Sequence, residues 1–277
     1  MDIIQGIIIG IVQGLTEFLP VSSSAHLVFI QNILGVESSL AFDTFLHLGT
    51  LIAVMWFFRY DIFKMIQSWI LSLEDITQGR FREGFYQDPY KRLAWYVILA
   101  TIPVGLAGVL FEDSVDALFA GALYVPAFFL FVTGTILYLS QRMTSGEINY
   151  DNITGKEALF MGLGQACAIL PGLSRSGTTI AAGLTIGLDK EFAAKFSFIL
   201  SIPAILGAFV LQIKDIGAAM GADFLPILFG FIAAIIAGYV AIKWMLDLIQ
   251  NKSLDIFAYY CWIVGLVVFM GSIAHIF

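Results

Sequence analysis

The chain is short of charged residues. Only 13% of its 277 residues are Asp, Glu, Lys or Arg, whereas about 25% is usual for a soluble domain. This shortage excludes an ordinary water-soluble globular protein. With a net charge of −7, the chain also gives no sign of a nucleic-acid partner.

Cysteine is scarcer still. Cys167 and Cys261 lie in apolar sequence without metal-type spacing, which excludes a disulfide framework and a thiolate metal site. We interpret both as small hydrophobic residues. The segment 1–6 lacks the basic region and cleavage site of a signal peptide, so the first apolar stretch is expected to remain in the mature protein.

Apolar sequence is abundant. Hydrophobic residues make up 59% of the chain, and its mean hydropathy is +0.90. Because backbone groups in lipid have to be hydrogen-bonded internally, we predict an all-α integral membrane protein. Six transmembrane helices are expected from six apolar stretches near the spanning length, at 43–58, 92–111, 122–140, 195–213, 224–246 and 254–276.

The basic residues orient these spans. The segment 59–92 is a long polar connection with six of the fourteen Lys and Arg residues, so the positive-inside rule places it in the cytoplasm. Alternation then puts an acidic loop at 112–116 outside and the 141–157 loop inside. If 157–190 enters and leaves the membrane on one side, twelve of the fourteen basic residues are cytoplasmic.

Two polar islands interrupt the apolar sequence, and the second repeats the first. They occupy 13–26 and 165–179, and equivalent residues are 152 positions apart. Polar and ionisable groups are costly within a membrane, so a functional site is the default interpretation. The residues that match at this offset include Gln13 and Gln165, Ser22 and Ser174, and Gly35 and Gly187.

Each island divides an apolar segment into two pieces, and each piece is too short to cross the membrane. The stretch 3–35 is interrupted at Pro20, and 157–190 is interrupted at Pro171 and Gly172. These breaks predict two re-entrant helical hairpins, because non-helical backbone at membrane depth has to line a protein cavity. One alternative is that 3–35 forms a single span, which would leave polar groups in lipid without partners.

The predicted orientation starts the two halves on opposite sides of the membrane. We therefore predict one membrane domain, 1–277, built of two inverted-topology repeats at about 1–140 and 157–277 and joined by a cytoplasmic loop. Interrupted segments in inverted repeats indicate a site near the midplane, where the two breaks meet.

The second island has the composition of an anion site. A helix begins after Pro171 and Gly172, and its free N–H groups, hydroxyls and one guanidinium suit phosphate. Arg175 supplies a planar fork for two phosphate oxygens. An alternative is that the serines only cap helices. The candidate phosphate-binding residues are Ser22, Ser174, Arg175, Ser176, Thr178 and Thr179.

A carboxylate beside a phosphate site repels the ligand unless a cation lies between them. Gln13 and Glu17 are four residues apart on one helix face, and their oxygens suit Mg²⁺ or Ca²⁺. General acid–base work and a structural pair with Arg175 are the other roles open to Glu17.

Ser23 and His26 are three residues apart on the next helix, which suits a hydroxyl activated by an imidazole or a base that activates water. Catalytic roles are therefore assigned to Ser23, His26, Glu17 and Arg175. Asp43 and His47 form another polar pair four apart, interpreted as a structural hydrogen bond.

These motifs resemble those of the undecaprenyl-diphosphatase family, also called bacitracin-resistance proteins. Gln13 to Glu17 matches the family's (Glu/Gln)-x-x-x-Glu element, and Pro171 to Thr179 matches its Pro-Gly-x-Ser-Arg-Ser-x-x-Thr element. The similarity covers essentially the whole chain. The first position is Gln13, where some members have a second glutamate.

The resemblance implies hydrolysis of a polyprenyl diphosphate to its monophosphate, which recycles a lipid carrier for cell-envelope glycan synthesis. It also implies a divalent cation, a cell-membrane location and a site that opens on the outer face. A homodimer is compatible with it. Attack by Ser23 and direct attack by water are both open, and a polyprenyl-phosphate transporter using the same site is the alternative function.

Overall fold

The structure is a computed structural model of the chain, and it confirms the all-α fold. Apart from one isolated bridge between Ile148 and Leu188, the described residues form no β-structure. Only the backbone is described at 40–41, 112–119 and 213–219. The described residues are 1–37, 40–119, 123–143, 146–219 and 224–274.

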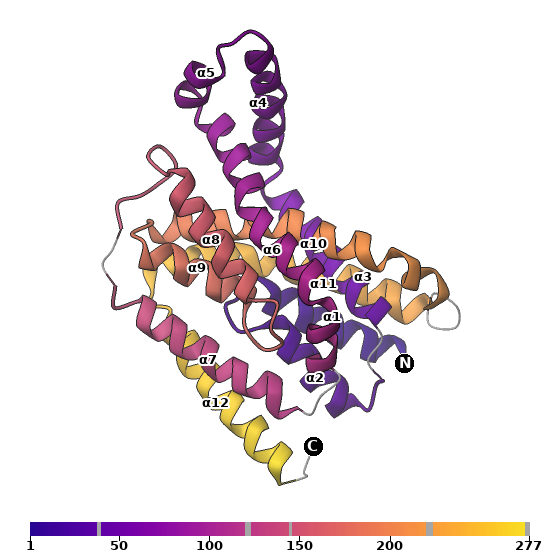
Figure 1. Cartoon of the computed structure of the whole chain (residues 1–277). Helices are drawn as coiled ribbons and strands as arrows, with labels where there is room; N and C mark the ends of the chain where they lie inside the picture. Colours follow the sequence, from indigo (N-terminus) through magenta and orange to yellow (C-terminus); the bar gives the residue numbers. More distant parts are fainter. Residues whose placement is uncertain (38–39, 120–122, 144–145, 220–223, 275–277) are drawn as a thin grey trace.

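Twelve helices follow one another along this part of the chain (Figure 1). They are α1 (Ile3–Phe18), α2 (Ser23–Leu34), α3 (Leu40–Phe57), α4 (Arg59–Thr77), α5 (Phe81–Gln87), α6 (Pro89–Phe119), α7 (Tyr124–Ser140), α8 (Gly155–Cys167), α9 (Arg175–Thr185), α10 (Lys190–Ala219), α11 (Phe224–Asn251) and α12 (Asp255–Ile273).

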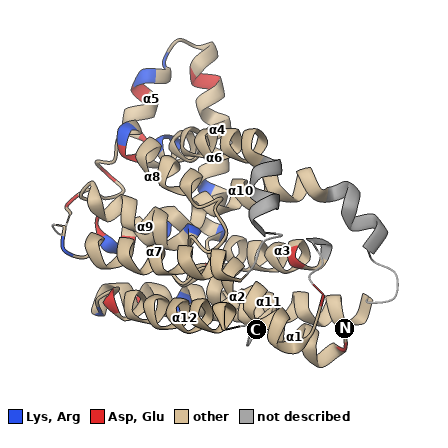
Figure 2. Ribbon diagram, turned by 60° about the horizontal axis from the view of Figure 1, so that its bottom comes forward, with Lys and Arg blue, Asp and Glu red and all other residues tan. Residues whose placement is uncertain are grey.

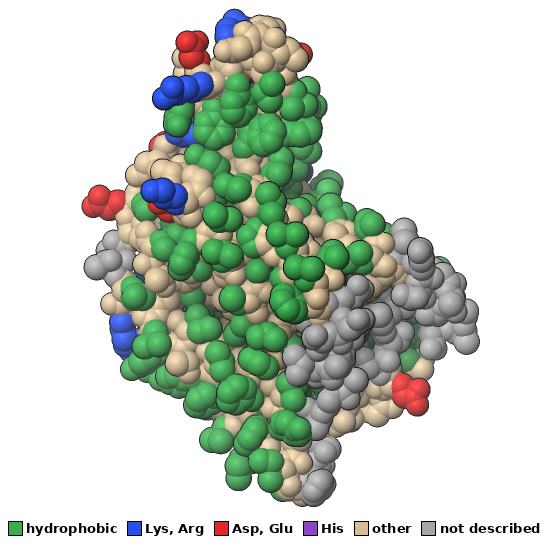
Figure 3. Space-filling model, viewed as in Figure 1, with side chains coloured by type: hydrophobic (Ala, Val, Ile, Leu, Met, Phe, Trp, Pro, Cys, Tyr) green, Lys and Arg blue, Asp and Glu red, His purple; other side chains and the backbone are tan. Residues whose placement is uncertain are grey.

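Four helices are long and apolar enough to cross a membrane, within α6, α10, α11 and α12. Helices α3 and α4 pass the same test together, but they meet at an 80° bend. At 17 residues, α7 is shorter than a usual span. Hydrophobic side chains cover much of the face seen in Figure 3. The protein is therefore a membrane protein with four or five candidate spans, and the count of six stays a prediction.

The segment 59–92, which the sequence indicates as a long polar connection, is helical over most of its length. It forms α4 and α5, which project from the body of the molecule together with the start of α6 (Figure 1). Trp95 of α6 donates from Nε1 to Ser72 Oγ of α4 at 2.9 Å, and Lys91 pairs with Asp75. Several Lys, Arg, Asp and Glu residues lie along this projecting end (Figure 2).

The acidic loop expected at 112–116 lies within a helix instead. The backbone of α6 continues to Phe119, which extends the apolar stretch predicted to end at residue 111. The side chains of Glu112, Asp113 and Asp116 lie outside the described residues.

Both predicted hairpins are present as pairs of short helices. α1 ends at Phe18 and α2 begins at Ser23, so the alternative of one continuous span over 3–35 is wrong. α8 and α9 are separated in the same way by residues 168–174. Their insertion into the membrane as re-entrant loops stays a prediction.

The repeat extends to the helix ends. Asp2 and Gln5 form a capping box at the start of α1, and Thr154 and Glu157 form one at the start of α8, 152 positions later. Each box satisfies N–H groups that a helix start leaves unpaired. The left-handed glycines Gly35 and Gly187, which follow α2 and α9, are also 152 apart. The two hairpins thus share their start and stop signals.

Each hairpin packs on a helix from the other half of the chain. α1 packs on α11, α8 packs on α6, and α7 packs on α12. Gly10 and Gly162, again 152 apart, allow the close approach to α11 and α6. The inverted orientation of the halves and their boundaries at about 1–140 and 157–277 stay predictions.

Substitution of Gly10 should weaken the packing of α1 on α11. A Cβ atom at Gly10 would lie 2.1 Å from the carbonyl oxygen of Gly230, so the two backbones have to move apart in Gly10→Ala. We expect a lower melting temperature in detergent, corresponding to about 1–3 kcal/mol. Gly105→Ala is the control, since a Cβ there meets no atom within 4 Å. Equal melting of both variants would contradict the packing described.

Candidate active site

The two breaks are joined directly to one another. Gly172 N–H donates to Ser24 Oγ at 3.4 Å, and Ser176 Oγ donates to the carbonyl oxygen of Leu19 at 3.1 Å. Ser24 and Ser176 are equivalent in the repeat, so each hairpin contributes one hydroxyl to the contact. The polar islands therefore come together as the sequence predicts.

The first serine of each island caps a helix. Ser22 Oγ accepts from Ala25 N–H at 3.4 Å, and Ser174 Oγ accepts from Gly177 N–H at 3.0 Å. Ser22 has a φ of +66°, alone among the described non-glycine residues, and such a backbone is strained for an L residue. Both serines thus have the capping role of the alternative interpretation, and their binding of phosphate stays a prediction.

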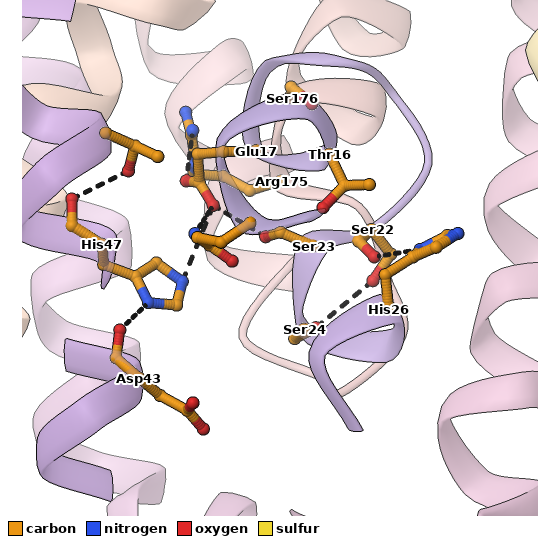
Figure 4. Close-up of polar contacts among 12 residues, drawn as sticks. Thr16, Glu17, Ser22, Ser23, Ser24, His26, Asp43, His47, Arg175 and Ser176 are labelled. Atoms are coloured by element: carbon orange, nitrogen blue, oxygen red, sulfur yellow. Dashed lines mark hydrogen bonds and ion pairs between the residues drawn. The ribbon is translucent and has the colours of Figure 1, made fainter. Parts of the chain in front are cut away.

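Glu17 lies at the centre of the site (Figure 4). Its Oε2 accepts from Gln13 Nε2 at 2.8 Å and from Ser23 Oγ at 2.7 Å. Its Oε1 accepts from an N–H of Arg175 at 2.9 Å. One carboxylate therefore connects the helix before the first break, the helix after it and the start of α9.

The Glu17–Arg175 pair is nearly buried. The side chain of Glu17 is 4% exposed and that of Arg175 is 16% exposed. Arg175 also donates to the backbone oxygen of Ser197 at 3.4 Å. A guanidinium has five N–H donors, so donors remain for a phosphate group. The structural pair was one of the roles left open for Glu17, and it is present.

His26 and Ser23 are not in hydrogen-bond contact in the structure. The ring of His26 is directed away from Ser23 (Figure 4). Its Nδ1 lies 2.8 Å from the carbonyl oxygen of Ser22, and its Nε2 lies 2.8 Å from the hydroxyl of Tyr260. Because a carbonyl only accepts, Nδ1 carries the proton and Nε2 accepts from Tyr260. The two rings also stack, 5.6 Å apart at 11°.

The remaining candidate phosphate-binding residues differ in their partners. Ser176 donates to Leu19, and Thr179 donates to the backbone oxygen of Arg175. Thr178 Oγ1 is buried and has no hydrogen-bond partner. Thr178 therefore has a hydroxyl free to bind another group.

Three residues near the site were not predicted as part of it. Thr133 accepts from Ser174 N–H at 3.0 Å, and Tyr260 orients His26. His47 Nε2 lies 3.6 Å from Glu17 Oε2. Its Nδ1 lies 2.7 Å from the backbone carbonyl of Asp43, so the predicted pair exists through the backbone and not through the carboxylate. The repeat gave no signal for Thr133 or Tyr260, which lie outside both islands.

The residues around Glu17 are compatible with a bound cation. Gln13 Oε1 is buried without a hydrogen-bond partner, and a cation would satisfy such an acceptor. Among the described side chains, no three His, Cys, Asp or Glu residues group together as metal ligands.

The fold and the site define a class: helical membrane proteins with a buried ionic and hydroxyl site where two broken hairpins meet. Residues 6–267 match the family described as bacitracin resistance protein BacA. Relatives agree with this match. A protein of Methanobrevibacter smithii named undecaprenyl-diphosphatase is 79% identical over 277 residues, all of both chains. The chain belongs to the BacA family.

Further relatives carry the same name. An undecaprenyl-diphosphatase of Methanosphaera stadtmanae is 48% identical over 275 residues, 99% of each chain. One from Carboxydothermus hydrogenoformans is 42% identical over 273 residues, 97% of each chain. The similarity to these relatives therefore covers nearly the whole chain.

Proposed function

We propose that this protein hydrolyses a polyprenyl diphosphate of the undecaprenyl type. In the net reaction one water molecule is consumed, the bridging P–O bond breaks, and the products are the lipid monophosphate and inorganic phosphate. This reaction recycles a lipid carrier for cell-envelope glycan synthesis in the cell membrane. The observation that carries the proposal is the buried Glu17–Arg175 pair, with the Ser23 hydroxyl bonded to the same carboxylate. The names of the relatives support it.

The geometry around Ser23 suggests how attack begins. Its hydroxyl already donates to Glu17 at 2.7 Å, so the carboxylate orients the oxygen and is placed to accept its proton as the bond to phosphorus forms and the bridging P–O bond breaks. Water then hydrolyses the phosphoserine, which releases inorganic phosphate and restores the Ser23 hydroxyl. His26 can assist Ser23 only after its ring leaves Tyr260. Direct attack by a water molecule held at Glu17 is the alternative.

Charge that develops on the phosphoryl oxygens needs preorganised donors. The free N–H groups of Arg175, with the N-terminal N–H groups of α9, supply them in a site from which water is largely excluded. Thr178 Oγ1, which has no partner, adds a hydroxyl. We assign phosphate binding to this side of the break.

We further propose that a divalent cation, Mg²⁺ or Ca²⁺, is held by Glu17 and Gln13. The buried and unpartnered Gln13 Oε1 supports this. When bound, such a cation supplies a positive charge that screens the diphosphate and eases departure of the lipid phosphate. Gln13 and Glu17 would hold it through side-chain oxygens, while Arg175 keeps its bond to Glu17 Oε1.

The site is proposed to open towards the outer face of the membrane. The exposed fraction of the side chain rises from 4% at Glu17 to 32% at His47. His47 lies in the first half of α3, a helix that starts outside in the predicted topology. A homodimer stays a prediction.

Labelling of introduced cysteines tests this orientation. In a background without Cys167 and Cys261, an impermeant maleimide should label a cysteine at position 116 in intact cells. A cysteine that replaces Glu83 should react only after permeabilisation. The opposite pattern would overturn the predicted orientation, and with it the outward opening of the site.

Tyr260→Phe should raise turnover without removing the aromatic stack. The change deletes the donor to His26 Nε2, and one such bond contributes about 0.5–1.5 kcal/mol, so the ring of His26 leaves position 260 more readily to assist Ser23. We expect about a two- to tenfold rise in kcat/KM. Tyr259→Phe is the control, because the Tyr259 ring contacts Tyr138 and Trp262 instead. Equal activity of both variants would show that the orientation of His26 is irrelevant to the reaction.

A polyprenyl-phosphate transporter is the second candidate. The direct contact between two broken hairpins favours it, since transporters also place their sites at such breaks. Proteoliposomes loaded with a fluorescent polyprenyl diphosphate distinguish the two functions. A phosphatase releases phosphate and loses this release in Ser23→Ala. Lipid movement that persists in Ser23→Ala, with no phosphate release by the unchanged protein, would support transport instead.

A further inference from the structure

When its ring is neutral, His47 directs a nitrogen lone pair towards a carboxylate. Its Nδ1 lies 2.7 Å from the carbonyl oxygen of Asp43, and a carbonyl cannot donate, so Nδ1 holds the proton of the neutral ring. Nε2 then carries a lone pair and faces Glu17 Oε2 at 3.6 Å. Two lone pairs at this distance repel each other unless a positively charged species lies between them.

A third acceptor belongs to the same group of residues. The amide of Gln13 donates from Nε2 to Glu17 Oε2 at 2.8 Å, and Oε1 of this amide is buried without a partner. Rotation of the amide by half a turn would exchange its two ends and bring Oε1 to the carboxylate. That arrangement also requires a cation, because both oxygens only accept.

We propose that His47 is a direct ligand of the divalent cation, beside Glu17 and the amide oxygen of Gln13. This inference rests on the proposed cation site. Metal bonds of about 2.1 Å to nitrogen and oxygen can bridge the 3.6 Å between His47 Nε2 and Glu17 Oε2. Neither the resemblance of the motifs nor the spacing within the islands pointed to His47, which lies on α3.

The surroundings of His47 leave room for the other ligands. Its side chain is 32% exposed, whereas that of Glu17 is 4% exposed. Protein would therefore cover a cation between them on the Glu17 side. On the His47 side it would be accessible, so water or phosphate oxygens could complete its coordination. Arg175 binds the other oxygen of Glu17, so the guanidinium and the cation flank one carboxylate.

An imidazole ligand changes which metals are preferred. Ca²⁺ takes oxygen ligands almost exclusively, whereas first-row divalent ions accept imidazole nitrogen readily. The site should therefore bind Mn²⁺ or Zn²⁺ more tightly than Ca²⁺. The competing role for His47 is a protonated ring in an ion pair with Glu17, which would repel a cation and supply it no nitrogen.

Mn²⁺ bound to the purified protein reports this nitrogen directly. Electron spin-echo spectra of the Mn²⁺ complex should contain modulation from a directly bound ¹⁴N nucleus. The modulation should change to that of ¹⁵N when the unchanged protein is made with [¹⁵N]histidine, a test that needs no variant to fold. In His47→Gln the histidine modulation should disappear, and the dissociation constant for Mn²⁺ should rise at least about tenfold.

His26→Gln is the matched control, because it removes the other histidine of the site and should leave the nitrogen modulation in place. Bound Mn²⁺ without histidine modulation, or modulation that survives in His47→Gln, overturns the ligand role of His47 and leaves the cation and the phosphatase standing. Failure of the unchanged protein to bind Mn²⁺ overturns this inference together with the cation site. Phosphate release in EDTA, measured on the same sample, then decides separately whether the phosphatase proposal survives.

Discussion

Replacement of Ser23 with alanine should lower phosphate release by at least about a thousandfold, equivalent to about 4 kcal/mol of transition-state stabilisation. The variant removes the oxygen that attacks phosphorus and the group that Glu17 orients at 2.7 Å. Glu17 keeps its bonds to Gln13 and Arg175, so the fold should be unaffected. Single-turnover phosphate release from a polyprenyl diphosphate measures the effect.

Ser24→Ala is the matched control for this variant. Ser24 neighbours Ser23 on the same helix, but its hydroxyl accepts from the backbone of Gly172 at 3.4 Å and does not contact Glu17. We expect Ser24→Ala to retain most of the activity. A fall of only about tenfold in Ser23→Ala would contradict attack by Ser23 and favour the water mechanism.

Arg175→Lys should reduce turnover by about 10²–10³-fold, the usual cost of one preorganised donor to a developing oxyanion. Lysine keeps the positive charge beside Glu17, so no buried carboxylate is left unpaired. It lacks the planar fork that binds two phosphate oxygens. Size-exclusion profiles should match those of the unchanged protein, while kcat falls.

Arg142→Lys provides the comparison. Arg142 pairs with Asp255 at 3.1 Å and is 46% exposed, and exposed pairs contribute little to stability. This variant should keep full activity. Near-normal turnover in Arg175→Lys would exclude a two-oxygen contact between Arg175 and the substrate.

The hairpins could be predicted because their signals are local. Pro20 follows the end of α1 and Pro171 follows the end of α8, since proline has no N–H group and disfavours the preceding helical turn. Proline needed the polar residues beside it as a second signal, because Pro103 and Pro203 lie inside α6 and α10. The repeat at 152 positions then aligned one break with the other. The segment 59–92 could not be assigned in this way. Its charges indicate a polar connection, whereas the packing of α4 on α6 through Ser72 and Trp95 depends on residues distant in the sequence.

The site was predicted where spacing along one helix decides a contact. Gln13 and Glu17, four residues apart, are hydrogen-bonded as expected. Ser23 and His26 share a helix face, yet each is hydrogen-bonded to a residue on another helix. Ser23 bonds to Glu17, and His26 bonds to Tyr260, 234 positions away. Spacing brings two side chains to one face, but it does not reveal the competing partners that tertiary packing supplies.

Phosphate release from an isoprenoid diphosphate of fifteen or more carbons tests the hydrolysis and the cation together. The purified protein in detergent is assayed with and without EDTA. Release that EDTA abolishes and that Mg²⁺ or Ca²⁺ restores is the predicted result, because the account assigns both the hydrolysis and the cation to the site at Glu17. No release under either condition, from protein that is folded, would contradict the account and leave lipid transport as the function of this site.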